Sequence, residues 1–313
     1  VVLTITRSLA KEFNIPNLCM AGGVALNCVA NGKILKEKTF TDIWIQPASG
    51  DAGGAIGGAL AVWHKELNKP RVVNPDDAMK GSYLGPIYRQ DEIEKELSEC
   101  GAIYNLVTEK DMIEQTSQAL SDGQTVGWFQ GRMEFGPRSL GDRSILGDPR
   151  SEKMQKTLNL KVKYRESFRP FAPSVLREDV TEWFELDYDS PYMLLVDGVK
   201  KDKRIEMTKE EKSLFGIHKL NIKRSSIPAV THVDYSARIQ TVHKKTNQKY
   251  HALINKFKEK TGCSVLVNTS FNVRGEPIVC SPEDAFKCFM SNELELLVIG
   301  NCILRKNEQY YLI

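Results

Sequence analysis

Two successive strand–turn–helix patterns near the start of the chain constrain its fold most strongly. The first runs NLCMAGGVALNCVANGKILKEK from Asn17, with a short apolar strand, a turn at Gly22 and Gly23, and an amphipathic helix. The second runs DIWIQP, then the turn ASGDAGG, then GAIGGALAVWHKEL. Glycine turns between strands and helices are typical of α/β layers, and phosphates or sugars often bind there. We therefore expect an α/β fold with ligand-binding turns in this region.

A connector and a second α/β unit follow. The stretch between Lys65 and Asp91 is rich in Pro, Gly, Asn and charged residues, which favours a loop. We place the domain boundary after residue 105, giving units 1–105 and 106–313. In the second unit, apolar patterning predicts helices over 109–123, 250–262 and 282–292 and strands over 125–131, 264–270 and 295–301.

Composition narrows the class of protein. With 313 residues, 41% of them hydrophobic, the chain can form one large or two ordinary cores. Its 43 basic and 40 acidic residues nearly balance, so bulk charge gives no reason to expect nucleic acid or a membrane as partner. Seven cysteines without a CxxC pair indicate buried thiols of a reducing cytoplasm. The chain opens at Val1 inside a helical pattern, so we expect a further N-terminal region.

The most informative motif is GRMEFGPRSLGDRSILGDPR, in which four arginines alternate with glycines. Guanidinium groups bind phosphate oxygens bidentately, and glycines let the backbone approach a bulky anion. The alternative is a solvated loop whose arginines pair with Glu134, Asp142 and Asp148. We favour a ligand site, because such a density of arginine beside apolar pairs is unusual for a plain loop. The arginines are Arg132, Arg138, Arg143 and Arg150.

A second basic motif is KVKYRESFRPFAPSVL. Lys163 and Arg165 alternate, so on an extended strand both side chains would point to one face and could bind neighbouring phosphates. Lys161 and Arg169 flank them. Taken alone, the pattern favours a charged, exposed strand edge over a ligand site.

Polar residues follow a buried strand in SVLVNTSFNVRGEP. The end of such a strand is where α/β proteins place ligand contacts, and Ser270 and Asn272 offer a hydroxyl and an amide two residues apart. Asn268 and Arg274 flank them and extend the candidate site. The alternative is an Asx-type turn that ends the strand.

Two further candidates carry weaker signals. Asp51 lies in a glycine turn before a helix, where a carboxylate could bind a metal ion or cap the helix, and the residues leave both open. His232, Asp234 and Arg238 lie close together in THVDYSARIQTV and could position a substrate, although a His beside an Asp is more often structural.

The absence of certain sequence motifs argues against several enzyme classes. The chain has no Gly-x-Ser-x-Gly elbow, Walker P-loop or HExxH, so an ordinary serine hydrolase, P-loop ATPase or zincin is not expected. Instead, six stretches closely resemble the NodU/CmcH carbamoyltransferase family, in order and over nearly the whole chain. They are AGGVALNCVANGKIL, QPASGDAGGAIGGAL, VGWFQGRMEFGPRSLGDRSILGDPR, KVKYRESFRPFAPSVL, PAVTHVDYSARIQTV and VLVNTSFNVRGEPIVCSPEDAFKCFM.

The resemblance implies a two-part enzyme. Residues 1–105 look like the end of an actin-like ATPase (Kae1-like) domain, and residues 106–313 look like a YrdC-like α/β domain. By family analogy, the YrdC-like part makes carbamoyladenylate from ATP and carbamoyl phosphate, and the Kae1-like part passes the carbamoyl group to a hydroxyl of a small-molecule acceptor. We further expect Mg²⁺ on the triphosphate and a possible homo-oligomer. We expect neither nucleic acid nor a membrane as a partner.

The resemblance also assigns roles to residues. The K-x-R and S-x-N pairs of YrdC-type domains match Lys163 with Arg165 and Ser270 with Asn272. Together with the bottom-up motifs, we assign catalysis to Lys163, Arg165, Arg132 and Arg138. We assign ATP binding to Arg143, Arg169, Ser270, Asn272, Arg274, Asn268, Gly22, Gly23 and Asn27.

Asp51 matches an aspartate that holds a metal, usually iron, near the nucleotide phosphates of the complete Kae1-like site. The histidines that complete the family's metal site lie in its N-terminal half. None of the five histidines here occupies that context.

Three rival functions remain. A threonylcarbamoyl-adenylate synthase of tRNA modification would share the paired motifs, but it would lack the Kae1-like segment. A hydrogenase-maturation carbamoyltransferase would carry zinc-finger segments, and no CxxC occurs here. A non-catalytic nucleotide-binding module would release no pyrophosphate.

Overall fold

The computed structural model describes residues 1–73, 76–220 and 222–309, and it is a mixed α/β structure, as the sequence predicts. The first unit holds a two-stranded parallel sheet in which Asn17 pairs with Asp42 and Met20 with Ile45. Its elements are α1 Val2–Phe13, β1 Asn17–Met20, a 3₁₀ turn Gly23–Leu26, α2 Cys28–Glu37, β2 Asp42–Ile45 and α3 Gly53–Ala61, which continues as a π-helix Val62–Glu66. Both strand–turn–helix patterns are therefore confirmed.

The second unit is built on a nine-stranded mixed sheet in the order β3-β11-β10-β4-β5-β9-β6-β8-β7. Two neighbouring pairs, β10 with β4 and β6 with β8, are parallel, and the other pairs are antiparallel. The strands are β3 Asn105–Leu106, β4 Val126–Phe129, β5 Arg143–Gly147, β6 Ala172–Leu176, β7 Leu195–Gly198, β8 Ser236–Val242, β9 Val265–Ser270, β10 Leu296–Ile299 and β11 Cys302–Arg305.

Helices cover this sheet. Helix α5 packs against α10, and α4 packs against α11. The helices are α4 Gln90–Glu99, α5 Glu109–Ser121, α6 Met154–Thr157, α7 Val180–Trp183, α8 Lys209–Ser213, α9 Ile217–Leu220, α10 Gln248–Thr261 and α11 Pro282–Met290. Helix α4, which precedes residue 106, packs on α11.

Large buried side chains fill the space between the sheet and its helices. Strand β4 is buried at every position, and its Trp128 donates a hydrogen bond to the carbonyl of Gly141 over 2.8 Å. Phe257 from α10, Phe289 from α11 and Phe271 after β9 are fully buried. Helix α11 begins with Ser281, which accepts a hydrogen bond from the Asp284 N–H, so the expected N-cap is present. In the described part of the chain, no helix has the length and apolarity needed to cross a bilayer.

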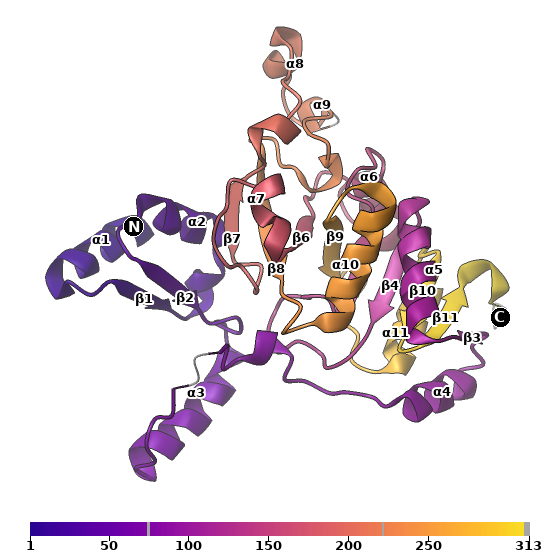
Figure 1. Ribbon diagram of the computed structural model, residues 1–313, viewed down its shortest axis with the longest axis horizontal. Helices are drawn as coiled ribbons and strands as arrows, with labels where there is room; N and C mark the ends of the chain where they lie inside the picture. Colours follow the sequence, from indigo (N-terminus) through magenta and orange to yellow (C-terminus); the bar gives the residue numbers. More distant parts are fainter. Residues whose placement is uncertain (74–75, 221, 310–313) are drawn as a thin grey trace.

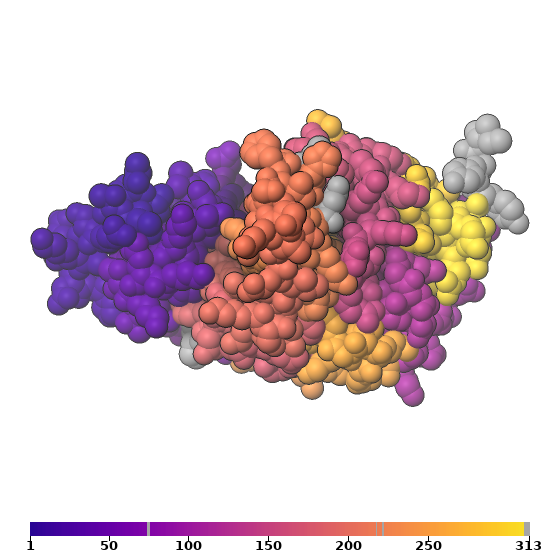
Figure 2. Space-filling model, turned by 90° about the horizontal axis from the view of Figure 1, so that it is seen from above, coloured from indigo at the N-terminus to yellow at the C-terminus, as the bar shows by residue number. Residues whose placement is uncertain are grey.

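The first unit contacts the second through α2 and the edge strand β7 (Figure 1). Buried Asn31 donates its amide to the carbonyls of Ala25 and Leu194, at 2.8 and 3.1 Å. Gly32 lies so close to β7 that an added Cβ would come 2.1 Å from the Val196 carbonyl oxygen. Figure 2 shows the result from above, with the first unit at one end of an elongated molecule and the C-terminal strands at the other.

The segment around Lys163 corrects one expectation. We expected an extended strand, but residues Leu158–Val162 form a π-helix, with Lys163 as its C-cap. Tyr164 then turns into the left-handed region with φ of 47°. The alternation of Lys163 and Arg165 therefore does not place them on one strand face, and their proximity has to come from the turn.

Candidate functional site

The ammonium group of Lys163 meets the turn after β9. Its Nζ donates to the backbone carbonyl and hydroxyl of Ser270 and, at 2.8 and 2.6 Å, to the carbonyl and side-chain oxygen of Asn272. Ser270 in turn donates its hydroxyl to the Asn272 side chain over 2.7 Å. Two motifs more than a hundred residues apart in sequence thus form one contact.

Burial makes this lysine unusual. Its side chain lies in the interior, and burial first, with the nearby charge of Arg165 second, lowers the pKa of Lys163 to about 7. The four surrounding oxygens are placed to accept hydrogen bonds from the ammonium form. All four oxygens are neutral, so a bound anion would supply the negative charge that this ammonium has no partner for.

Arg165 lies next to Lys163 and is oriented by neighbours. Its Nε donates to the Asn159 side-chain oxygen over 2.6 Å, and its guanidinium lies 5.0 Å from the centre of the Phe171 ring. Burial and the charge of Arg169 lower the pKa of Arg165. These contacts fix the side chain without neutralising it.

Two further arginines complete the group. Arg238 projects from β8, and burial followed by the charge of Arg138 lowers its pKa to about 10, with a smaller effect of Arg165. Arg138 comes from the loop between β4 and β5, and its buried Nε has no hydrogen-bond partner among the described residues. We call Lys163, Arg165, Arg138 and Arg238 the cation cluster. Arg238 was singled out in sequence only as a neighbour of His232, so its place here is new.

The cation cluster lacks carboxylate partners. Within the described ranges, no ion pair joins any of its four members to an Asp or Glu, whereas Arg150, for comparison, binds Asp148 at 2.7 Å. Besides burial, Arg165 lowers the pKa of Lys163, and Arg138 and Arg165 lower that of Arg238. Cations this close together are unfavourable unless an anion binds between them. The arrangement is therefore suited to a phosphate-bearing ligand.

At the edge of this cluster, Glu166 holds two of the predicted arginines. Arg169 pairs with it at 3.1 Å and Arg274 approaches it at 3.9 Å. Both arginines are exposed, and both already have an acidic neighbour. They lie near Arg165, but they are not among the unpaired cations.

Two predicted binding residues make several contacts inside the protein. Arg143 is fully buried in β5, donates to the carbonyls of Gln130 and Asp142 at 2.5 and 3.0 Å, and stacks 3.5 Å from the Phe129 ring centre. Asn268 is buried and donates its amide to Ser139, Ser174 and Gln240. In these two side chains, only the Nε of Arg143 and the Oδ1 of Asn268 lack a hydrogen-bond partner among the described residues, so most polar atoms of both side chains are engaged within the protein. Arg132 is exposed and donates to the Gly85 carbonyl over 3.0 Å, apart from the cluster.

The GGVALN turn of the first unit faces the same junction. Gly22 has φ of 86°, which favours glycine, and open space surrounds both Gly22 and Gly23. Asn27 caps α2 by accepting the Ala30 N–H over 3.1 Å. The next residue, Cys28, lies near enough to the Arg238 side chain to raise the pKa of that arginine, which burial otherwise lowers. This contact joins the α2 N-terminus, and with it the turn, to the cation cluster.

Asp51 stands without other metal ligands. It is exposed in the turn before α3. Across residues 1–73, 76–220 and 222–309, no group of three or more His, Cys, Asp or Glu side chains could hold a metal ion. The residues present therefore do not form the iron site that the resemblance implies, and we derive no step through iron.

His232 and Asp234 form a local turn. The His232 Nδ1 lies 3.1 Å from the Ser236 hydroxyl, and that hydroxyl donates to Asp234 over 2.6 Å. Burial lowers the pKa of His232. The pair orders the start of β8, the strand that carries Arg238.

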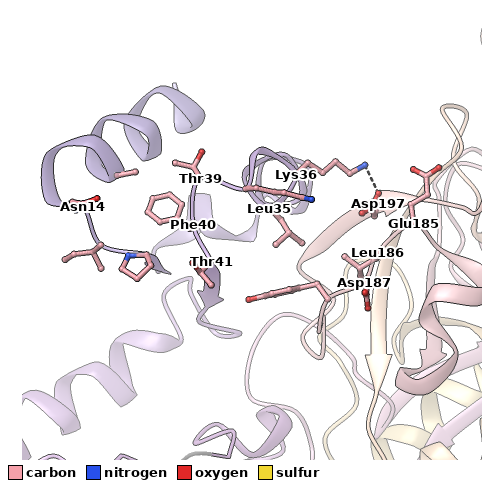
Figure 3. Close-up of a pocket in the computed structure, with 15 residues that line it drawn as sticks. Asn14, Leu35, Lys36, Thr39, Phe40, Thr41, Glu185, Leu186, Asp187 and Asp197 are labelled. Atoms are coloured by element: carbon pink, nitrogen blue, oxygen red, sulfur yellow. Dashed lines mark ion pairs between the residues drawn. The ribbon is translucent and has the colours of Figure 1, made fainter.

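A large cavity lies elsewhere on the junction. It measures about 1020 Å³ and lies between the α1–α2 side of the first unit and residues 185–188. Figure 3 shows Phe40 and Leu35 along one wall and the Lys36–Asp197 ion pair, 2.5 Å long, at its edge. None of the predicted site residues lines it. Its charges are paired or mixed, so we place the candidate site at the cation cluster.

Comparisons with known proteins identify the family. The family model for the carbamoyltransferase C-terminus matches residues 117–306, which include the whole cation cluster, and the model for the carbamoyltransferase N-terminus matches residues 1–60. An uncharacterized protein of Synechocystis sp. is 58% identical over 99% of this chain and 51% of its own length. The nodulation protein NolNO of Sinorhizobium fredii is 41% identical over 98% of this chain and 42% of its own.

A relative with a named activity also matches. The 3'-hydroxymethylcephem-O-carbamoyltransferase of Streptomyces clavuligerus is 30% identical over 92% of this chain and 49% of its own length. The chain spans about half the length of the curated relatives it matches. On the family models and these identities, the chain belongs to the carbamoyltransferase family.

Proposed function

We propose that this chain forms carbamoyladenylate from ATP and carbamoyl phosphate at the cation cluster, as part of an ATP-dependent O-carbamoyltransferase. The observation that carries the proposal is the convergence of four cations without a carboxylate partner at the junction of the two units. A triphosphate with its Mg²⁺ would supply the missing negative charge. Family membership supports the carbamoyl group as the cargo.

The proposed reaction has three steps. Water cleaves carbamoyl phosphate to carbamate and phosphate. A carbamate oxygen then attacks the α-phosphorus of ATP, and the bond to the bridging oxygen breaks to release pyrophosphate. Finally, an acceptor hydroxyl attacks the carbamoyl carbon, AMP leaves, and the hydroxyl proton is released.

Lys163, Arg165 and Arg138 would act in the second step. Negative charge builds on the oxygens around the α-phosphorus and on the leaving pyrophosphate, and preorganised cations stabilise that charge more than they stabilise the bound substrate. Lys163 is fixed by Ser270 and Asn272, and Arg165 by Asn159. Little reorganisation is then needed during the reaction.

The first unit would receive the activated group. Gly22, Gly23 and Asn27 form an open turn beside Cys28, which contacts Arg238, so a nucleotide bound at the cluster could extend toward the first unit. We propose a hydroxyl-bearing small molecule as acceptor, which the name of the cephem-modifying relative supports. The division into a Kae1-like part, 1–105, and a YrdC-like part, 106–313, belongs to the same proposal.

The test is ATP/pyrophosphate exchange that depends on carbamoyl phosphate. Wild type should exchange, and Lys163→Ala and Arg165→Ala should each reduce the rate by at least about tenfold, as expected for loss of a transition-state cation. Lys95→Ala, on exposed α4 away from the cluster, should leave the rate unchanged. No exchange from folded wild-type chain would contradict adenylation by this chain.

A further inference from the structure

The loop between β4 and β5, residues 130–142, carries Arg138 and is anchored on both sides of that residue. Before Arg138, Phe135 donates its N–H to the Ser82 carbonyl over 2.7 Å. Near its end, the Leu140 carbonyl accepts from the Tyr83 hydroxyl at 2.8 Å and from the Gln240 amide at 2.6 Å. The position of Arg138 therefore depends on how the loop closes between these anchors.

Glu134 closes the loop from within. One oxygen of its buried carboxylate, Oε1, accepts the backbone N–H groups of Leu140 at 2.6 Å and Asp142 at 2.9 Å. A weaker third contact comes from the Arg143 N–H at 3.4 Å. The side chain thus joins residue 134 to residues 140–142, and Arg138 lies inside the closed ring.

Burial of the Glu134 carboxylate costs free energy of folding. Glu134 has no ion pair within the part of the chain that the structure describes, and burial raises its pKa despite the backbone donors and the nearby Arg143. A buried charge without a salt bridge is retained only if its hydrogen bonds are useful. Here the Glu134 carboxylate accepts hydrogen bonds from loop N–H groups that have no carbonyl partner in a strand or helix.

The closed loop also contacts the first unit. Gly136 has φ of 137°, and a Cβ added there would lie 3.1 Å from the Pro47 carbonyl oxygen. The loop tip is therefore confined between the β4–β5 side and the turn that precedes Asp51. Loss of the Glu134 bonds would free the segment 135–139 within that gap and move Arg138.

We propose that Glu134 is a positioning residue that holds Arg138 in the cation cluster by accepting the backbone N–H groups of residues 140 and 142. This inference deepens the proposed function and rests on the same site. Glu134 itself touches no ligand. It acts by hydrogen-bond geometry and not by its charge.

A double-mutant cycle with inorganic pyrophosphate as the probe tests it. Titration calorimetry should give about a tenfold weaker Kd for Arg138→Ala and for Glu134→Ala, the loss expected for one charge-assisted contact. In the double variant, Glu134→Ala should add less than about twofold, because it acts through an arginine already removed. Glu134→Gln keeps a carbonyl acceptor and should bind within about threefold of wild type.

The matched control is Glu295→Ala. Glu295 also accepts a backbone N–H, that of Thr125 at 2.8 Å, at the start of β4 and apart from Arg138. Its loss should leave the pyrophosphate Kd unchanged. Far-UV circular dichroism and thermal unfolding establish that each variant is folded.

Three outcomes would overturn the inference. Independent, multiplicative effects of Glu134→Ala and Arg138→Ala would show that Glu134 does not act through Arg138. Loss of binding in Glu134→Gln equal to that in Glu134→Ala would mean that the charge is what counts. If the wild-type chain binds no pyrophosphate, the cation cluster is not an anion-binding site. Pyrophosphate binding without ATP/pyrophosphate exchange would contradict the proposed adenylation and leave this inference standing.

Discussion

At the scale of single residues, the structure shows two ways to bury a cation. Backbone carbonyls and an aromatic ring hold most of the Arg143 guanidinium, and only its Nε lacks a hydrogen-bond partner among the described residues. Lys163 has only neutral oxygens around it, and its pKa falls to about 7. The first stabilises the fold, and the second prepares a site for an anion.

Arg143 and Arg138 should therefore differ in what their loss affects. Arg143→Met leaves buried carbonyls without donors and should lower the free energy of unfolding by about 3 kcal/mol. Arg138→Met removes a buried cation without a partner, so it should leave stability equal or higher while it weakens pyrophosphate binding. Urea unfolding and titration calorimetry on both variants check this. If Arg138→Met destabilised the fold while Arg143→Met only weakened pyrophosphate binding, the roles assigned to the two arginines would be contradicted.

The pKa of Lys163 predicts a pH dependence of anion binding. The lysine is charged below its folded pKa of about 7 and loses its charge as pH rises through that value. Pyrophosphate affinity should therefore fall between pH 6 and 8 more steeply for wild type than for Lys163→Met, in which only the ligand and other groups titrate. Equal slopes for the two proteins would show that Lys163 does not titrate in this range.

Residue roles in the site were only partly predictable. The resemblance singled out Lys163, Ser270 and Asn272 through two paired motifs, but the contact between them became visible only in the structure. Arg143 and Arg138 occur five residues apart in one motif, and nothing local distinguishes them, because burial of Arg143 depends on Phe129 and Gln130 from the neighbouring strand. Arg238 gave no signal beyond its nearness to His232.

At the scale of elements, helix α2 couples the first unit to the sheet. Its buried Asn31 and its Lys36 bind the segment around β7, and its N-terminal Cys28 contacts Arg238. The helix therefore sets where the GGVALN turn lies relative to the cation cluster.

Close packing of α2 on β7 makes Gly32 sensitive to substitution. In Gly32→Ala the new Cβ would lie 2.1 Å from a backbone oxygen, so the helix has to shift. Hydrogen exchange should then speed up in α2 and β7. Gly57→Ala, in α3 with nothing within 4 Å of the added Cβ, is the matched control and should be neutral or stabilising by about 0.5 kcal/mol. Unchanged exchange in Gly32→Ala would mean that the two elements separate easily.

Elements with strong periodicity were predictable and irregular ones were not. Helices α5, α10 and α11 and strands β4, β9 and β10 lie where apolar patterning placed them. The π-helix at Leu158–Val162 was missed, because a K-x-R alternation has the period of a strand while the Asn159 side chain and the Tyr164 turn impose a different path. Strands β5 and β6 lie in stretches dense in Arg, Gly and Pro, which local propensity assigns to loops.

At the scale of the whole molecule, the cation cluster draws on distant parts of the chain. Its members come from the β4–β5 loop, the π-helix C-terminus and strand β8, and the first unit reaches it through Cys28. This assembly is the central claim, because the proposed adenylation needs all four charges at one place.

The most direct test is a crystal structure of this chain with ATP and Mg²⁺. We expect triphosphate oxygens about 3 Å from the side-chain nitrogens of Lys163, Arg165, Arg138 and Arg238. We also expect Arg143 to keep its contacts with backbone carbonyls. A triphosphate bound elsewhere, for example in the cavity beside Lys36 and Asp197, would contradict it.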